Sequence, residues 1–329
     1  MQRRKFIAIL GGAVVSWSRS ARTQQADRMR HIGILMLLAE DDPASKPRIE
    51  AFLQSLQQLN WTVDRNVKID IRWGAADATR ARKDAAELVA FAPDVILAVA
   101  SPATAALQEA THTLPIVFVN VTDPVGAGYV ASLARPGGNA TGFAYIEYGM
   151  SGKWLALLKE IAPAVTRAAI LRDPALPVGI GQFGAIQSAG PSFGIEITPI
   201  DVRDPAGIER DITEFVRKPN GGLIVAAGPA ALINRNVIIA VAAEHRLPAV
   251  YFQSDFVRAG GLVSYGPDAV AEYGQAASYI DRILRGEKPA DLPVQAPTKY
   301  ETSINLKTAK DLGLTLPPAL LARADKVIE

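Results

Sequence analysis

The stretch DVILAVASPATAALQEATHTLPIVFVNVTD, residues 94–123, decides the fold. It predicts a buried strand over residues 95–100, a turn at Ser101 and Pro102, a helix over about residues 103–111 and a second buried strand over Ile116–Val121. Continuous Val- and Ile-rich strands that alternate with helices are typical of a parallel sheet covered on both faces. The stretch therefore predicts an α/β protein.

Polar side chains follow both strands, at the sheet edge where parallel α/β proteins bind ligands. Ser101 and Thr104 lie at the start of the helix, whose free N–H groups and dipole favour a ligand carboxylate. Thr122 and Asp123 follow the second strand, and the Asp123 carboxylate would pair with a ligand ammonium. The alternative interpretations are a helix N-cap for the first two residues and a turn cap for Asp123.

A similar order recurs later in the chain. Residues 222–227 (GLIVAA) predict a strand, which is followed by Gly228, Pro229 and Ala230, a helix and another strand. Two similar α/β halves with facing strand ends imply a cleft between two lobes. The second half would contribute Phe252, Gln253 and Asp255 to this cleft, because they follow the equivalent strand.

Two further candidates lie near the expected cleft. Tyr265, in an expected crossing between the lobes, would stack on or hydrogen-bond a planar ligand, or else pack at the hinge. Asp41 belongs to the acidic loop after the first strand, residues 31–38, and would pair with a ligand ammonium or stay solvated. No metal-ligand spacing or catalytic constellation accompanies these residues, so we expect neither a metal site nor a cofactor nor an enzyme.

The length and composition indicate a globular protein. A chain of 329 residues with 49% hydrophobic and 21% charged residues is long enough for two globular domains. It contains no Cys, which excludes disulfides and a thiol nucleophile. The first 23 residues hold five basic residues and no acidic one, so the remainder is close to neutral. A near-neutral body argues against nucleic acid as a partner.

Residues 1–23 have the layout of a cleaved export signal. A basic start precedes an apolar run over about residues 6–15, which is too short to anchor the chain stably in a bilayer. Arg3 and Arg4, followed by Phe6 and Ile7, resemble a twin-arginine signal, although Gln2 stands where Ser or Thr is usual. We therefore expect a periplasmic protein.

Several phrases along the whole chain identify a family resemblance. They are RRKFIA, HIGIL, SPATAALQEAT, LPIVFVNVTDPVGAG, RPGGNATGF, AGGLVSYGPD and PTKYETSINLKTAKDLGLTLPP. The chain resembles the bacterial ABC-transporter substrate-binding family that includes tryptophan- and tyrosine-binding members. The resemblance implies a type I periplasmic binding protein fold, with two Rossmann-like lobes joined by a three-strand hinge.

The resemblance also implies how the chain is organised and what it does. The N-terminal lobe would comprise residues 30–143 plus about 263–290, and the C-terminal lobe residues 144–262 plus about 291–329. A monomer would capture a small ligand, an amino acid or another small organic acid, in the cleft and deliver it to an ABC permease and its ATPase. The family often carries an Asp-Pro-aromatic turn where this chain has Gly228, Pro229 and Ala230.

Two alternative functions remain open from the sequence. Gly179, Gly181 and Gly184 match the dinucleotide-binding fingerprint, with Asp201 about 20 residues further on. An exported NAD(P)-dependent oxidoreductase would explain that match. A ligand-sensing domain for a membrane receptor would have the same two-lobed organisation as a transport protein.

Overall fold

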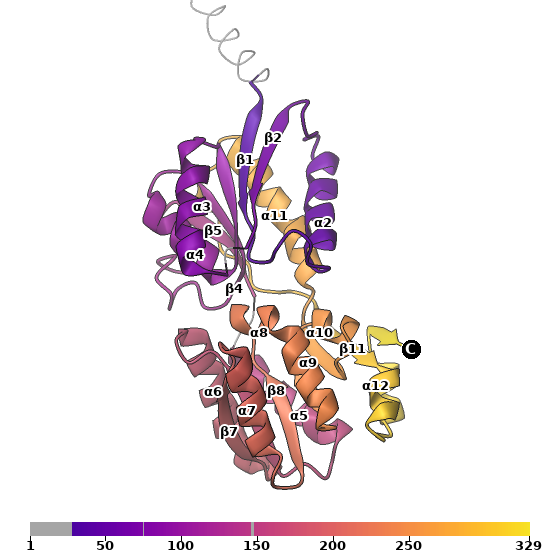
Figure 1. Ribbon diagram of the computed structural model, residues 1–329. Helices are drawn as coiled ribbons and strands as arrows, with labels where there is room; N and C mark the ends of the chain where they lie inside the picture. The colour runs from indigo at the N-terminus through magenta and orange to yellow at the C-terminus, as the bar shows by residue number, and fades with distance from the viewer. Residues whose placement is uncertain (1–27, 75, 146–147) are drawn as a thin grey trace, which may run out of the picture.

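The protein forms two α/β lobes, one above the other in Figure 1, in a computed structural model that describes residues 28–74, 76–145 and 148–329. The expected export signal, residues 1–23, lies outside the described residues. None of the described helices combines the length and the apolar character needed to cross a bilayer.

The first lobe is built on a five-stranded parallel sheet with the order β2-β1-β3-β4-β5. Its strands are β1 (Arg30–Leu35), β2 (Val67–Arg72), β3 (Val95–Val99), β4 (Ile116–Val121) and β5 (Ala140–Ala144). Its helices are α2 (Ser45–Gln58), α3 (Ala78–Ala90), α4 (Ala100–Ala110), α11 (Ala269–Leu284) and the short η3 (Pro289–Asp291). This order is that of a doubly wound sheet, in which the connections change sides between β1 and β3.

Two helical layers bury both faces of this sheet, with α3 and α4 on one side and α2 and α11 on the other (Figure 1). Neighbouring residues of a strand contribute to opposite layers. Leu97 belongs to the same buried cluster as Phe52 of α2, whereas Ile96 belongs to the cluster of Leu107 of α4, and all four side chains are fully buried. The apolar runs of the sequence are therefore continuous because both faces of each central strand are covered.

The second lobe holds a seven-stranded sheet with the order β12-β11-β10-β9-β8-β6-β7. Its strands are β6 (Arg167–Arg172), β7 (Glu196–Asp201), β8 (Gly221–Val225), β9 (Ala249–Tyr251), β10 (Val263–Pro267), β11 (Tyr300–Asn305) and β12 (Lys326–Ile328). All neighbours are parallel except β10 and β11. The run β7-β6-β8-β9-β10 repeats the order of the first lobe, so the recurrence predicted from the sequence is confirmed.

Helices cover this second sheet as well. They are α5 (Ser151–Ile161), α6 (Pro177–Ala189), α7 (Pro205–Phe215), α8 (Pro229–Ile233), α9 (Arg235–Glu244), α10 (Ser254–Arg258), α12 (Leu306–Asp311) and α13 (Pro318–Ala322), with the short η1 (Tyr148–Met150) and η2 (Gly190–Phe193). The recurrent unit β8-α8-α9-β9 corresponds to β3-α4-β4, with its helical part divided in two at Asn234.

The chain passes between the lobes three times: after β5, after β10 and between Gln295 and β11. The lobe boundaries differ from expectation in two places. Residues 263–267, expected in the first lobe, form β10 and pair with β9 and β11 in the second sheet. Residues 291–295, expected in the second lobe, still contact the first, where the Gln295 N–H donates to the Gly142 carbonyl at 3.0 Å. The first difference arises because the chain leaves each sheet only after its fifth strand, and the second because Gln295 forms a bridge with Phe143 of β5.

Replacement of Gly142 by Ala is expected to destabilise the first lobe. Gly142 in β5 has a φ of 153°, and an added Cβ would lie 2.0 Å from the Phe118 carbonyl oxygen of the neighbouring strand β4. We expect Gly142→Ala to lower the free energy of unfolding by about 3 kcal/mol or more, the range of clashes that backbone cannot relieve cheaply. The matched control is Gly138→Ala, because nothing lies within 4 Å of that position. Equal urea midpoints for the two variants would contradict the prediction.

Candidate ligand-binding site

A cavity of about 40 Å³ lies between the lobes, and we call it the cleft cavity. Twelve residues line it: Leu37, Ala100, Ser101, Asn120, Thr122, Tyr145, Val178, Gly228, Pro229, Leu232, Phe252 and Gln253. Leu37 follows β1 and Ser101 follows β3, so the cavity lies at the point where the connections of the first sheet change sides. Ligands of doubly wound proteins bind at this point. The present volume has room for a few water molecules.

The backbone beside the cleft cavity is locally strained. Ala100, Asn120 and Asp123, at the carboxyl ends of β3 and β4, have φ values of 68°, 57° and 50°. Residues other than glycine adopt this left-handed region at a cost, and such residues cluster at binding sites. At Ala100 the cause is local, because α4 begins directly after β3 without a connecting loop.

Four of the predicted site residues line the cleft cavity: Ser101, Thr122, Phe252 and Gln253. They come from the strand ends of both lobes, where the sequence analysis expected them. Ser101 is already inside α4, and its carbonyl oxygen accepts a hydrogen bond from the Tyr129 hydroxyl at 3.1 Å.

Two predicted residues of the first lobe are committed to local structure instead. Thr104 is fully buried one turn into α4, and its hydroxyl donates to the Ala100 carbonyl at 3.0 Å. Asp123 forms a turn: its carboxylate accepts from the Gly126 N–H at 2.8 Å and from the Tyr148 hydroxyl at 3.0 Å. Neither residue lines the cavity. The turn-cap alternative therefore describes Asp123. Burial, and next the hydrogen bond to Asp123, raise the pKa of Tyr148 to about 12.

The other two candidates lie away from the cleft cavity. Asp41 is exposed, whereas its neighbour Asp42 binds Arg235 of the second lobe at 2.9 Å. Tyr265 belongs to β10, where its ring stacks on Tyr300 at a centroid distance of 5.9 Å. Because β10 is a strand of the second sheet and not a crossing, Tyr265 faces α5 and contacts Lys153.

Asp255 lies behind the cavity wall in a buried polar network. Its carboxylate binds Arg48 of α2, with Nη2 and Oδ2 2.6 Å apart, and it also binds Arg258 of its own helix. Burial opposes ionisation of Asp255, but the charges of Arg48 and Arg258 outweigh it and hold the pKa of this carboxyl below its ordinary value of 3.8. Gln253 connects this network to the cavity, since its amide contacts both Asp255 and Tyr145.

Several lining residues escaped the sequence analysis. Asn120 carried a signal, because it is the one polar residue within the apolar strand IVFVNV. Leu37, Val178 and Leu232 carried none, since an apolar residue that lines a cavity looks like any core residue. Arg48, which lies behind the cavity wall, was also missed. The sequence pattern predicts that it faces solvent on an amphipathic helix, yet only 1% of its side chain is exposed.

The glycines of the dinucleotide fingerprint lie within a helix. Gly179, Gly181 and Gly184 all belong to α6, which begins at Pro177, whereas the fingerprint requires a glycine turn between a strand and a helix. Two of these glycines allow close packing: a Cβ on Gly181 would lie 2.5 Å from the Tyr148 ring, and one on Gly179 would lie 2.0 Å from the Asp173 carbonyl oxygen. The arrangement therefore does not form the predicted pyrophosphate-binding turn. In the part of the chain that the structure describes, no cluster of three or more His, Asp or Glu residues could hold a metal ion.

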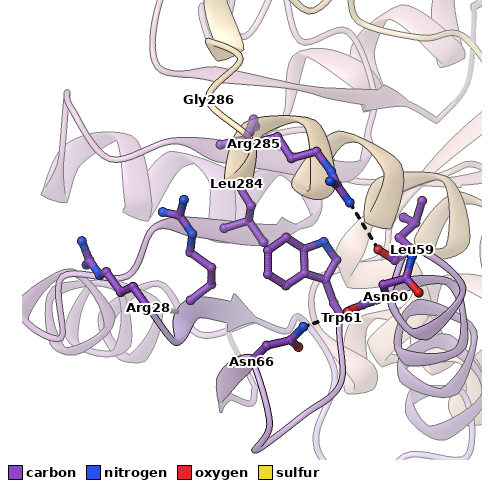
Figure 2. A pocket seen from close by; sticks show the side chains of 10 residues that line it. Arg28, Leu59, Asn60, Trp61, Asn66, Leu284, Arg285 and Gly286 are labelled. Carbon is purple, nitrogen blue, oxygen red and sulfur yellow. Dashed lines mark hydrogen bonds between the residues drawn. The ribbon is translucent and has the colours of Figure 1, made fainter. Parts of the chain in front are cut away.

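A second cavity, of about 540 Å³, lies at the opposite end of the first lobe (Figure 2). Its arginines are bound to carboxylates of the same lobe: Arg30 to Asp94 at 2.9 Å and Arg285 to Asp281 at 2.7 Å. The Trp61 indole also donates to Asp281. All its lining residues come from the first lobe, so a ligand there would not bridge the lobes. The cleft cavity, although smaller, is the better candidate.

Comparison with known proteins identifies the family. A family model described as ABC transporter substrate binding protein matches residues 31–328. The chain belongs to this family. A tyrosine-binding protein of Clostridioides difficile (strain R20291) is 25% identical over 303 residues, which are 90% of this chain and 85% of the relative.

Solved structures agree with this assignment. The structure of an ABC domain from Streptococcus pneumonia in complex with L-Trp has a TM-score of 0.83 and 25% identity, and covers 91% of this chain and 99% of that one. The ligand-free, open structure of a substrate binding protein with adhesive properties from Clostridium difficile has a TM-score of 0.69 and covers 91% and 99%; its 23% identity shows the fold alone. The expected family and type I periplasmic binding protein fold are confirmed. The family and the Clostridium difficile structure are both described as substrate-binding proteins.

Glu272, in the first turn of α11, is a buried carboxyl beside the cleft cavity. Only 4% of the residue is exposed, and its Oε2 accepts from the Asn120 N–H at 3.1 Å. Oε1 has no hydrogen-bond partner among the described residues. Burial raises the pKa of Glu272 well above its ordinary value of 4.5, and the Asn120 N–H and Arg48 oppose the shift without cancelling it.

Replacement of Glu272 by Gln is expected to stabilise the protein at neutral pH. A carboxyl with a raised folded-state pKa contributes most stability below its unfolded pKa, near 4.5, and loses it as the pH rises toward the folded-state pKa. The amide avoids this loss, so Glu272→Gln should raise the melting temperature by about 2 °C or more near neutral pH, with a smaller gain below pH 4.5. The control is Glu40→Gln, since Glu40 is exposed. A Gln variant that is less stable throughout this pH range would contradict the prediction.

Proposed function

We propose that this protein is the exported solute-binding component of an ABC importer. It captures one small ligand in the cleft cavity, and closure of the lobes encloses that ligand. The observation that carries this proposal is the cavity itself, which is lined at the carboxyl ends of the strands by side chains from both lobes. The family assignment supports the same role.

The ligand class follows from the lining and the relatives. Ser101, Asn120, Thr122 and Gln253 offer hydrogen bonds, while apolar residues such as Phe252 supply contact area. The amino-terminal N–H groups of α4 favour a carboxylate. One relative is a tyrosine-binding protein and another was solved with L-Trp. We therefore propose an amino acid, the aromatic amino acids included, or another small organic acid.

The present cavity is too small for such a ligand, so the lobes must separate to admit it. Its volume of about 40 Å³ lies far below the roughly 300 Å³ or more of typical ligand pockets. The three crossings between the lobes would act as the hinge. The closed, loaded form would dock as a monomer on a transmembrane permease, whose ATPase drives uptake from the periplasm.

A thermal-shift screen tests this function. Amino acids, aromatic acids and nicotinamide cofactors are added to the purified protein, and one amino or organic acid is expected to raise the melting temperature. A ligand present at 100 times its Kd stabilises the folded state by about 2.7 kcal/mol, which amounts to roughly 5 °C or more. Isothermal titration calorimetry should give one site per chain.

The variant that tests the site is Gln253→Leu, which removes the amide from the cavity wall. It is expected to weaken binding about tenfold or more, the effect of one lost hydrogen bond to a buried ligand. The matched control is Gln57→Leu on the exposed side of α2. Stabilisation by NAD(P) alone, or unchanged binding in Gln253→Leu, would overturn the assignment of the cleft cavity.

A further inference from the structure

An ion pair joins the two lobes beside the cleft cavity. Arg48 lies in the first turn of α2 in the first lobe, and Asp255 lies in α10 of the second. Arg48 Nη2 and Asp255 Oδ2 are 2.6 Å apart, and only 1% and 4% of the two side chains are exposed. Because each lobe supplies one partner, separation of the lobes at this point breaks the pair.

The ion pair is connected to the cavity wall through Gln253. The Gln253 Nε2 donates to Asp255 Oδ2 at 2.5 Å, and its Oε1 accepts from the Tyr145 hydroxyl at 2.7 Å. Both Gln253 and Tyr145 line the cleft cavity. The amide of Gln253 therefore has a fixed orientation, with one N–H and one lone pair left for a ligand.

The other groups around Arg48 do not replace this pair. Arg48 Nη1 donates to the Ala44 carbonyl at 2.6 Å, within its own lobe. The carboxyl of Glu272 and the hydroxyls of Tyr145 and Tyr273 also lie near its charge. On the other side, Arg258 binds Asp255 from the same helix and stays with it when the lobes separate. Arg48 is thus the member of the network that opening removes.

We propose that Arg48 is a positioning residue for the ligand: its ion pair with Asp255 latches the closed lobes and fixes the Gln253 amide in the cleft cavity. Buried ion pairs add little net stability compared with apolar contacts, but they favour one geometry over others. This ion pair, which we call the latch, therefore shifts the equilibrium between the open and closed forms more than it changes the free energy of unfolding. The part that concerns ligand affinity rests on the proposed function.

The lobe separation can be measured without a ligand. The chain contains no Cys, so Cys introduced at the exposed positions Glu109 and Glu209, one in each lobe, can be spin-labelled selectively. Pulsed electron–electron double resonance then gives the distribution of distances between the two spin labels, and hence between the lobes. We expect Arg48→Met to shift it toward longer distances, with Arg48→Lys intermediate. The control Arg203→Gln, which breaks an exposed pair with Asp201, should leave it unchanged.

The positioning role is tested by a double-mutant cycle on affinity. With the acid found in the thermal-shift screen, Arg48→Met is expected to weaken binding about tenfold or more in the wild-type background. In the Gln253→Leu background, the same substitution should weaken binding of the acid by less than about threefold, because the group that Arg48 positions is already absent. Full additivity of the two effects would overturn the positioning role.

The outcomes separate this proposal from the function on which it rests. If no acid binds but the distances shift in Arg48→Met, the solute-binding function fails and the latch stands. If an acid binds and the distances in Arg48→Met equal those of wild type, the function stands and the latch is overturned. Circular dichroism of each variant shows whether it is folded, and Arg48→Lys replaces Arg48→Met in the cycle should the latter unfold.

Discussion

The structure depends on the requirement that parallel strands be covered on both faces. The middle residues of the central strands β1, β3 and β4 are buried, so their side chains pack into the two helical layers and cannot contact a ligand. Only the strand ends are free for binding. Since both lobes repeat the same strand order, their carboxyl ends can face each other, and the cleft cavity forms where they meet. The fold thus determines the place of the site before any polar residue is chosen.

At these strand ends, some polar residues line the cleft cavity and others stabilise the turns beside it. Asp123 uses both carboxylate oxygens to fix the turn after β4, where its own φ is positive. Ser101 and Thr122, by contrast, line the cavity. A carboxylate at a strand end therefore need not be a ligand contact, because a turn that supports the site can require it as much as the ligand does.

The sequence predicted the architecture well because the signals are local. Buried strands read as apolar runs, and the recurrence of one strand-helix-strand unit gave two lobes. Thr104 does not line the cleft cavity because α4 begins at Ala100, earlier than expected, which places Thr104 one turn inside the helix. Tyr265 lies away from the cleft cavity because residues 263–267 form a strand of the second sheet, and nothing local in the sequence distinguishes such a strand from a crossing. Arg48 was missed because its partner lies 207 residues away in the chain.

That separation in sequence is also what gives the Arg48–Asp255 pair its character. An ion pair within one lobe, such as that between Asp255 and Arg258, is the same whether the lobes are open or closed. A pair between the lobes exists only when they meet, so its free energy belongs to the closed form. Since Asp255 also holds the amide of Gln253, the same contact that closes the lobes orders the cavity wall. The pair between Asp42 and Arg235 also joins the lobes, but Asp255 is the carboxylate that binds both an inter-lobe arginine and an amide of the cavity wall.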